Sequence, residues 1–146
     1  MDWKNEAIEM LTNYNAKRQS LTIIPLQIAE IEAEMTSLPS CTDMLTVRGR
    51  KAAAPDDKLL NCIVKKEALQ RCFEQSKLYV AAVEKGLEIL DDEERHILTV
   101  MYINREKGWK DRLMAELFLV EESSLYKKSR KILRQFTIAM YGCLEC

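Results

Sequence analysis

The chain has 146 residues, of which 47% are hydrophobic and 31% are charged, while only four are Gly and three are Pro. This composition excludes collagen-like, low-complexity and disordered classes and favours a helical globular protein. The formal net charge of -1 gives no global argument for a polyanionic partner, so any basic binding site has to be local.

Membrane and export signals are also missing from the sequence. No run approaches the roughly 18 uncharged apolar residues of a membrane span, and the first residues lack the basic and apolar regions of a signal peptide. The odd number of cysteines, five, favours reduced thiols over a disulfide framework. We therefore expect no membrane partner and a cytoplasmic location.

Apolar side chains recur at alternating spacings of four and three over residues 3–38, which predicts one long amphipathic helix with a heptad seam. Pro25 lies inside this segment, and we expect it to kink the helix without ending it, because the seam keeps its phase on both sides. The predicted seam consists of Trp3, Ala7, Met10, Tyr14, Leu21, Ile24, Ile28, Ile31, Met35 and Leu38.

Residues 39–55 show no sustained period and predict a mobile loop, after which a second seam predicts a second long helix. Together the two helices predict a long antiparallel hairpin over residues 1–90, with Lys66 near Ile28. An additional apolar set on the second helix leaves open whether it contacts the rest of the chain or a second copy in a homodimer. The second seam consists of Leu59, Cys62, Lys66, Leu69, Phe73, Ser76, Val80, Val83, Leu87 and Leu90.

Residues 91–146 carry shorter periodic segments and predict a second domain. A helix capped by Asp91 or Asp92 is followed by a turn, a short helix over Trp109–Phe118, a tight turn and a last helix over about residues 123–140 that Gly142 ends. This order is the outline of a helix-turn-helix domain. The expected fold is therefore all-α, a long helical hairpin followed by a three-helix helix-turn-helix domain.

The predicted last helix carries five basic residues between positions 127 and 134 and no acidic residue among them. At 100° per residue these side chains lie mostly away from the apolar stripe of Leu125, Ile132 and Phe136. A basic helix of this kind suits the major groove of DNA, where phosphates attract Lys and Arg and the amino-terminal residues of the helix contact base edges. The predicted base contacts are Ser123, Ser124, Tyr126 and Lys127, and the predicted phosphate contacts are Lys128, Arg130, Lys131 and Arg134.

Three segments resemble region 4 of bacterial sigma-70 factors: residues 90–103 (LDDEERHILTVMYI), residues 109–119, and residues 124–133 (SLYKKSRKIL). The whole chain resembles the small sigma-region-4-like proteins of bacteriophages and prophages that are grouped near the ArpU and RinA late transcriptional regulators. In that resemblance residues 124–134 match the recognition helix. Leu90, Ile97, Leu98, Tyr102, Leu113 and Leu117 match structural positions.

The resemblance implies a regulator in a bacterial host cell that binds double-stranded DNA, with RNA polymerase as a further contact. The sequence departs from the family pattern at the predicted tight turn, where Phe118 stands at a position that commonly has Gly. Glu121 and Glu122 also place negative charge near the expected position of the DNA. These departures leave the geometry of the turn open.

A second interpretation is a protein-binding adaptor or inhibitor of phage origin that acts through the long hairpin. Catalysis has no recognisable centre, because the only histidine, His96, has no Ser or Cys nucleophile in a known motif and no Gly-rich phosphate loop is present. Cys143 and Cys146 have the spacing of zinc ligands but no second pair nearby. We therefore expect no enzyme activity, no cofactor and no metal.

Overall fold

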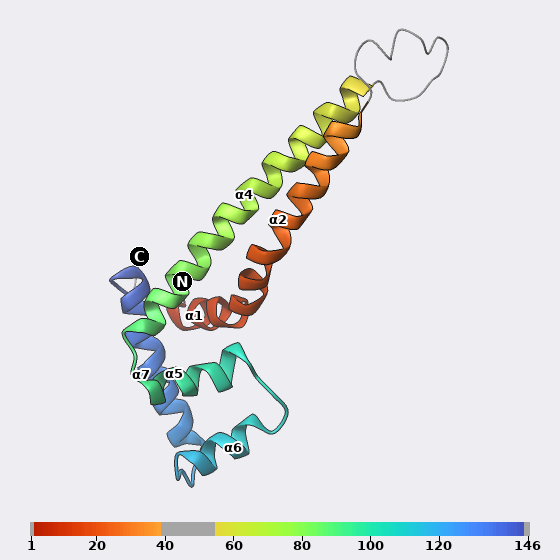
Figure 1. Ribbon diagram of the computed structural model, residues 1–146. Helices are drawn as coiled ribbons and strands as arrows, with labels where there is room; N and C mark the ends of the chain where they lie inside the picture. The colour runs from red at the N-terminus through yellow and green to blue at the C-terminus, as the bar shows by residue number, and fades with distance from the viewer. Residues whose placement is uncertain (1, 39–54, 145–146) are drawn as a thin grey trace, which may run out of the picture. The chain divides into compact units, whose positions relative to one another are not determined.

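The computed structural model of the protein describes residues 2–38 and 55–144. These residues form helices and no strand, which confirms the all-α class (Figure 1). The loop predicted over residues 39–55 lies outside the described residues, apart from Pro55, where helix α4 begins. None of the described helices combines the length and the apolar character that crossing a membrane requires.

The chain divides into two compact units. The first, here called the core unit, consists of residues 1–18 and 78–146, and the second, here called the paired-helix unit, consists of residues 19–77. This division differs from the predicted boundary between residues 1–90 and 91–146. The reason is that the first helix packs with the C-terminal helices, so both ends of the predicted hairpin belong to the core unit.

In the paired-helix unit, parts of helix α2 (Tyr14–Ser37) and helix α4 (Pro55–Glu88) lie side by side and run antiparallel (Figure 1). The ammonium of Lys66 lies 3.0 Å from the carboxylate of Glu32. This contact is about one helical turn from the predicted position of Lys66 beside Ile28. Three predicted seam residues of this unit, Ile24, Cys62 and Ser76, are buried.

The first predicted helix is two helices, so the prediction of one helix kinked at Pro25 was wrong. Helix α1 (Trp3–Thr12) ends at Asn13, and α2 continues through Pro25. The break has a packing cause, because α1 belongs to the core unit, where Ala7 and Leu11 are fully buried, whereas α2 passes into the paired-helix unit after residue 18.

The C-terminal helices follow the predicted order. Helix α5 (Asp92–Leu98) begins with a capping box in which Asp91 and Glu94 bond each other's backbone N–H groups. A π-helical segment, η1 (Thr99–Ile103), continues α5 directly, and helices α6 (Trp109–Glu116) and α7 (Glu122–Tyr141) follow. Gly142 ends α7 with φ 79°, and its N–H donates to Ile138 O at 2.7 Å, as the sequence predicts.

Apolar side chains from all of these helices form the centre of the core unit. Among the six residues that match structural positions in the resemblance, Tyr102 and Leu117 are half-buried and the other four are at most 2% exposed. Helix α4 approaches α7 closely at Gly86, where a Cβ atom would lie 2.6 Å from the buried ring of Phe136. The most buried residues here include Leu90, Ile97, Leu98, Met101, Leu113, Leu125, Ile132, Leu133 and Phe136.

The turn between α6 and α7 is a Schellman motif. The N–H of Leu119 donates to Met114 O at 2.9 Å, and the N–H of Phe118 donates to Ala115 O at 3.3 Å. Phe118 has φ 56°, in the left-handed region that favours glycine, and its side chain is 92% exposed. The position where the resemblance has Gly therefore has the conformation that Gly adopts most easily.

We expect Phe118→Gly to raise the free energy of unfolding by about 0.5–1 kcal/mol. An L-residue in the left-handed region costs roughly 1–2 kcal/mol, and the flexibility of Gly in the unfolded chain offsets about half of that gain. Chemical denaturation of both proteins measures the difference. Val120→Gly is the matched control, because Val120 is 94% exposed in the same turn without a positive φ. This control should lose roughly 0.5–1 kcal/mol, and a loss in both variants would contradict the expectation.

Candidate nucleic-acid interface

Helix α7 has one buried side and one exposed side. Its buried side combines apolar residues with Ser129 and Thr137, whose hydroxyls bond Tyr102 Oη at 3.0 Å and Leu133 O at 2.8 Å. The hydrogen bonds of these buried hydroxyls offset the cost of removing them from water, so both polar residues are compatible with the buried side. The charged side chains of α7 are therefore directed away from the centre of the core unit.

Four cations of α7 line a hollow of about 420 Å³, which we call the basic groove. All four are exposed, and none forms an ion pair with a carboxylate of the residues that the structure describes. Trp3 from α1 and Leu144 after α7 complete the lining. The four cations are Lys127, Arg130, Lys131 and Arg134, each a predicted DNA-contacting residue.

Lys128, the fifth predicted cation, does not line the basic groove. Its ammonium lies 2.8 Å from the carboxylate of Glu93, an ion pair that connects α7 to α5. The side chains of Lys128 and Glu93 are 41% and 57% exposed, so water screens the pair and its contribution to stability is on the order of 0–1 kcal/mol. The predicted phosphate contact at Lys128 therefore competes with an intramolecular carboxylate.

The amino-terminal residues of α7 differ in exposure. Ser123 is exposed and its hydroxyl donates to the carboxylate of Glu121 at 3.3 Å, whereas Ser124 is half-buried. Tyr126 is 43% exposed, and its ring lies 5.6 Å from the ammonium of Lys110. Of the three predicted base contacts that lie outside the groove lining, Ser123 and Tyr126 are thus the more accessible to a ligand.

Several residues near the amino terminus of α7 were not among the predicted site residues. Lys110, in the first turn of α6, lies 3.6 Å from the carboxylate of Glu122, and the hydrogen bond with Tyr126 followed by the charge of Glu122 raises the pKa of Lys110. The guanidinium of Arg105 lies 4.7 Å from the ring of Trp109. Residues 105–112 contain four basic residues, which could have indicated these positions. The sequence pattern was used there only to predict a turn and a short helix.

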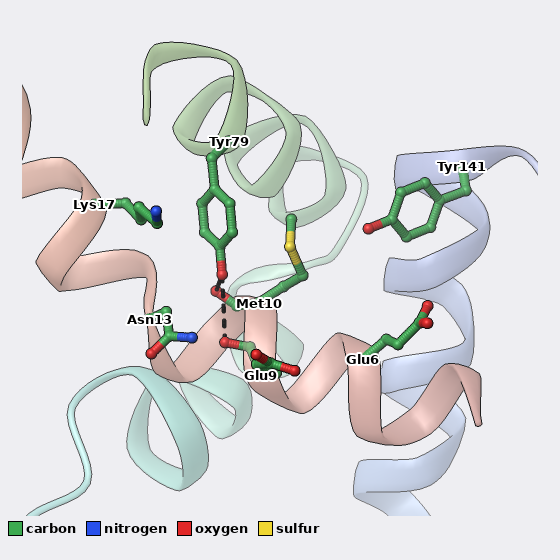
Figure 2. A pocket seen from close by; sticks show the side chains of 7 residues that line it. All are labelled: Glu6, Glu9, Met10, Asn13, Lys17, Tyr79 and Tyr141. Atoms are coloured by element: carbon green, nitrogen blue, oxygen red, sulfur yellow. Dashed lines mark hydrogen bonds between the residues drawn. The ribbon is translucent and has the colours of Figure 1, made fainter. Parts of the chain in front are cut away.

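A second hollow of about 490 Å³ lies in the core unit around Tyr79 (Figure 2). The Tyr79 hydroxyl is directed at α1, where its bonds to the carbonyls of Met10 at 2.8 Å and Glu9 at 3.3 Å connect α4 to the end of that helix (Figure 2). Burial raises the pKa of Tyr79, and the charge of Glu9 adds to that effect. The ammonium of Lys17 lies 5.5 Å from the Tyr79 ring. Tyr79 is thus engaged in holding two helices together.

The remaining candidate residues have structural contacts. His96 Nε2 lies 2.7 Å from the carboxylate of Glu116, a pair that connects α5 to α6. Within residues 2–38 and 55–144, no group of three or more His, Cys, Asp or Glu side chains is arranged to hold a metal ion. Cys62 and Cys72 are free thiols, but Cys143 is disulfide-bonded, contrary to the expectation of reduced thiols. Cys146 of the zinc-like pair lies outside the described residues.

Comparison of the chain with protein-family models, with curated proteins and with solved structures finds no match. The resemblance to sigma-70 region 4 therefore stays a prediction from the residues quoted above.

Proposed function

We propose that this protein is a DNA-binding transcriptional regulator of phage or prophage type, in which α7 contacts double-stranded DNA through the basic groove. The observation that carries the proposal is the set of four exposed cations without a carboxylate partner among the described residues. Like charges held on one side of a helix repel one another, and a polyanion relieves that repulsion. Phosphates of DNA supply such charges at regular spacing.

The helix order of the core unit supports the same proposal. In a helix-turn-helix domain the second helix of the motif enters the major groove, which is about 12 Å wide and admits one helix. Here α6, the tight turn and α7 supply the motif, with Ser123 and Tyr126 near the amino terminus of α7 as base contacts. The cations of the basic groove then hold phosphates.

The triple variant Lys127→Glu, Arg130→Glu, Lys131→Glu should lose at least about 100-fold in affinity for DNA, because three attractions to phosphate become repulsions. Gel-shift titration with bacterial genomic fragments at low salt measures the affinity. For the unaltered protein, the logarithm of the affinity should fall with the logarithm of salt concentration with a slope of about -0.9 for each phosphate contacted.

The matched control is Lys58→Glu, Lys65→Glu, Lys77→Glu, which changes the net charge equally at exposed positions of α4. It should bind within a few-fold of the unaltered protein, and both variants should keep the helical circular dichroism spectrum. Equal affinities in the two triple variants would refute the proposed interface.

Glu93→Gln should strengthen DNA binding by about twofold to tenfold. The change removes a carboxylate that lies 2.8 Å from Lys128 and so releases that ammonium to contact phosphate. Gel-shift titration again measures the effect. Glu67→Gln removes the same charge from an exposed position of α4 and should have little effect. An equal gain in both variants would mean that the release of Lys128 is not the cause.

The second candidate function is the protein-binding adaptor or inhibitor. It is favoured by Leu60 and Val64, four residues apart on one face of α4 and 58% and 54% exposed. If this face contacts bacterial RNA polymerase, Leu60→Glu with Val64→Glu should abolish co-elution with the polymerase in gel filtration. Gln70→Glu with Gln75→Glu, also exposed on α4, adds the same charge and should not. Co-elution that survives the apolar substitutions would rule this face out.

A further inference from the structure

The basic groove contains an aromatic wall as well as cations. Trp3 lies in the first turn of α1, which packs along α7, and its indole is half-buried beside the four cations. The start of α1 is fixed by Asp2, whose carboxylate accepts from the Lys4 backbone N–H at 3.1 Å and from the Asn5 side chain at 2.8 Å. This cap fixes the backbone of the helical turn that carries Trp3.

The two tryptophans of the chain differ in what covers their rings. Trp109 has cations of its own chain on its ring, with Arg105 at 4.7 Å and Lys110 at 5.8 Å. Trp3 shares a hollow with four cations, yet no cation–π contact to its ring is formed by the described residues. Within the described part of the chain, the Trp3 ring thus has no cation–π partner and the four cations have no carboxylate partner.

A ligand that uses both parts needs a phosphate and a flat aromatic group. We propose that the basic groove binds a nucleoside phosphate, with the phosphate among the guanidinium and ammonium groups of α7 and the base stacked on Trp3. The inference rests on the proposed function for the cations and adds Trp3 as a base contact. A positively charged groove with an aromatic platform is the general arrangement by which proteins hold unpaired nucleotides.

The nucleotide has two sources, a free mononucleotide and an unpaired nucleotide of a DNA strand. A base inside an intact duplex is stacked on both faces, so Trp3 can contact it only at a strand end or after it leaves the stack. DNA with a single-stranded overhang should therefore contact Trp3 more than a blunt duplex of the same length does.

The test uses the full chain with Trp109→Phe, which leaves Trp3 as the only tryptophan. Its fluorescence is measured during titration with deoxyadenosine monophosphate, a blunt duplex, the same duplex with an overhang, ribose 5-phosphate and inorganic phosphate. We expect quenching by the mononucleotide or by the overhang, each identifying its source, and none by the two phosphates that lack a base. Absence of quenching by both would overturn the inference.

Two further variants test the stacking. Trp3→Phe keeps an aromatic face and should retain most of the affinity for the overhang duplex, whereas Trp3→Leu should lose about tenfold. Equal affinities of the two variants would count against stacking. If Trp3→Leu folds less well, the affinity of Trp3→Phe and the fluorescence quenching still test the stacking.

The outcomes separate this inference from the proposed function. If the Lys127, Arg130 and Lys131 triple variant loses duplex binding while Trp3 is never quenched, the regulator proposal stands and the inference fails. If that variant loses only nucleotide quenching and binds duplex DNA normally, the inference stands and the regulator proposal fails.

Discussion

Burial of one side of α7 is the constraint on which the rest of the core unit depends. Phe136 packs where α4 has only Gly86, and α1 packs along the same helix, so α7 has neighbours on several sides of its apolar stripe. Turning α7 by one residue, about 100°, would move a Lys or Arg into this environment, where an unpaired charge costs several kcal/mol. The exposure of the cations therefore follows from the burial of the apolar stripe. That stripe comprises Leu125, Ile132, Leu133 and Phe136.

Local patterns in the sequence were sufficient to predict much of this unit, and long-range packing was not. The spacing of apolar residues gave the buried side of α7, and local hydrogen-bonding chemistry gave the cap at Asp91 and the end at Gly142. The break at Asn13 was missed because no Gly or Pro marks it and the seam continues in phase across it. What ends α1 is that its apolar side packs with helices more than 80 residues later, a contact that periodicity does not contain.

The same distinction applies to the candidate site. That α7 presents cations to solvent could be predicted from the helical projection alone. That Lys128 pairs with Glu93 could not, because the two residues are 35 positions apart and meet only when α5 packs on α7. Trp3 was assigned to a hairpin seam, whereas the structure places it in the basic groove, since α1 lies along α7 and not only beside α4.

The charge distribution of the core unit gives the basic groove its significance. Acidic residues outnumber basic ones in the chain, 23 to 22, so carboxylates are not scarce. In this unit Arg95, Lys110, Arg112 and Lys128 each lie within 3.6 Å of a carboxylate oxygen. Other cations of this unit, among them Lys4, Lys85 and Lys107, also form no ion pair with a described carboxylate, so the groove differs in that four such cations lie together, where their mutual repulsion opposes folding. A folded protein departs from its own local rules mainly at sites that bind something, where the ligand compensates the cost. An anion that binds only the folded groove also stabilises the fold by mass action. The repulsion among the cations lowers the stability of the free protein, and its relief by the anion contributes to the stability of the complex.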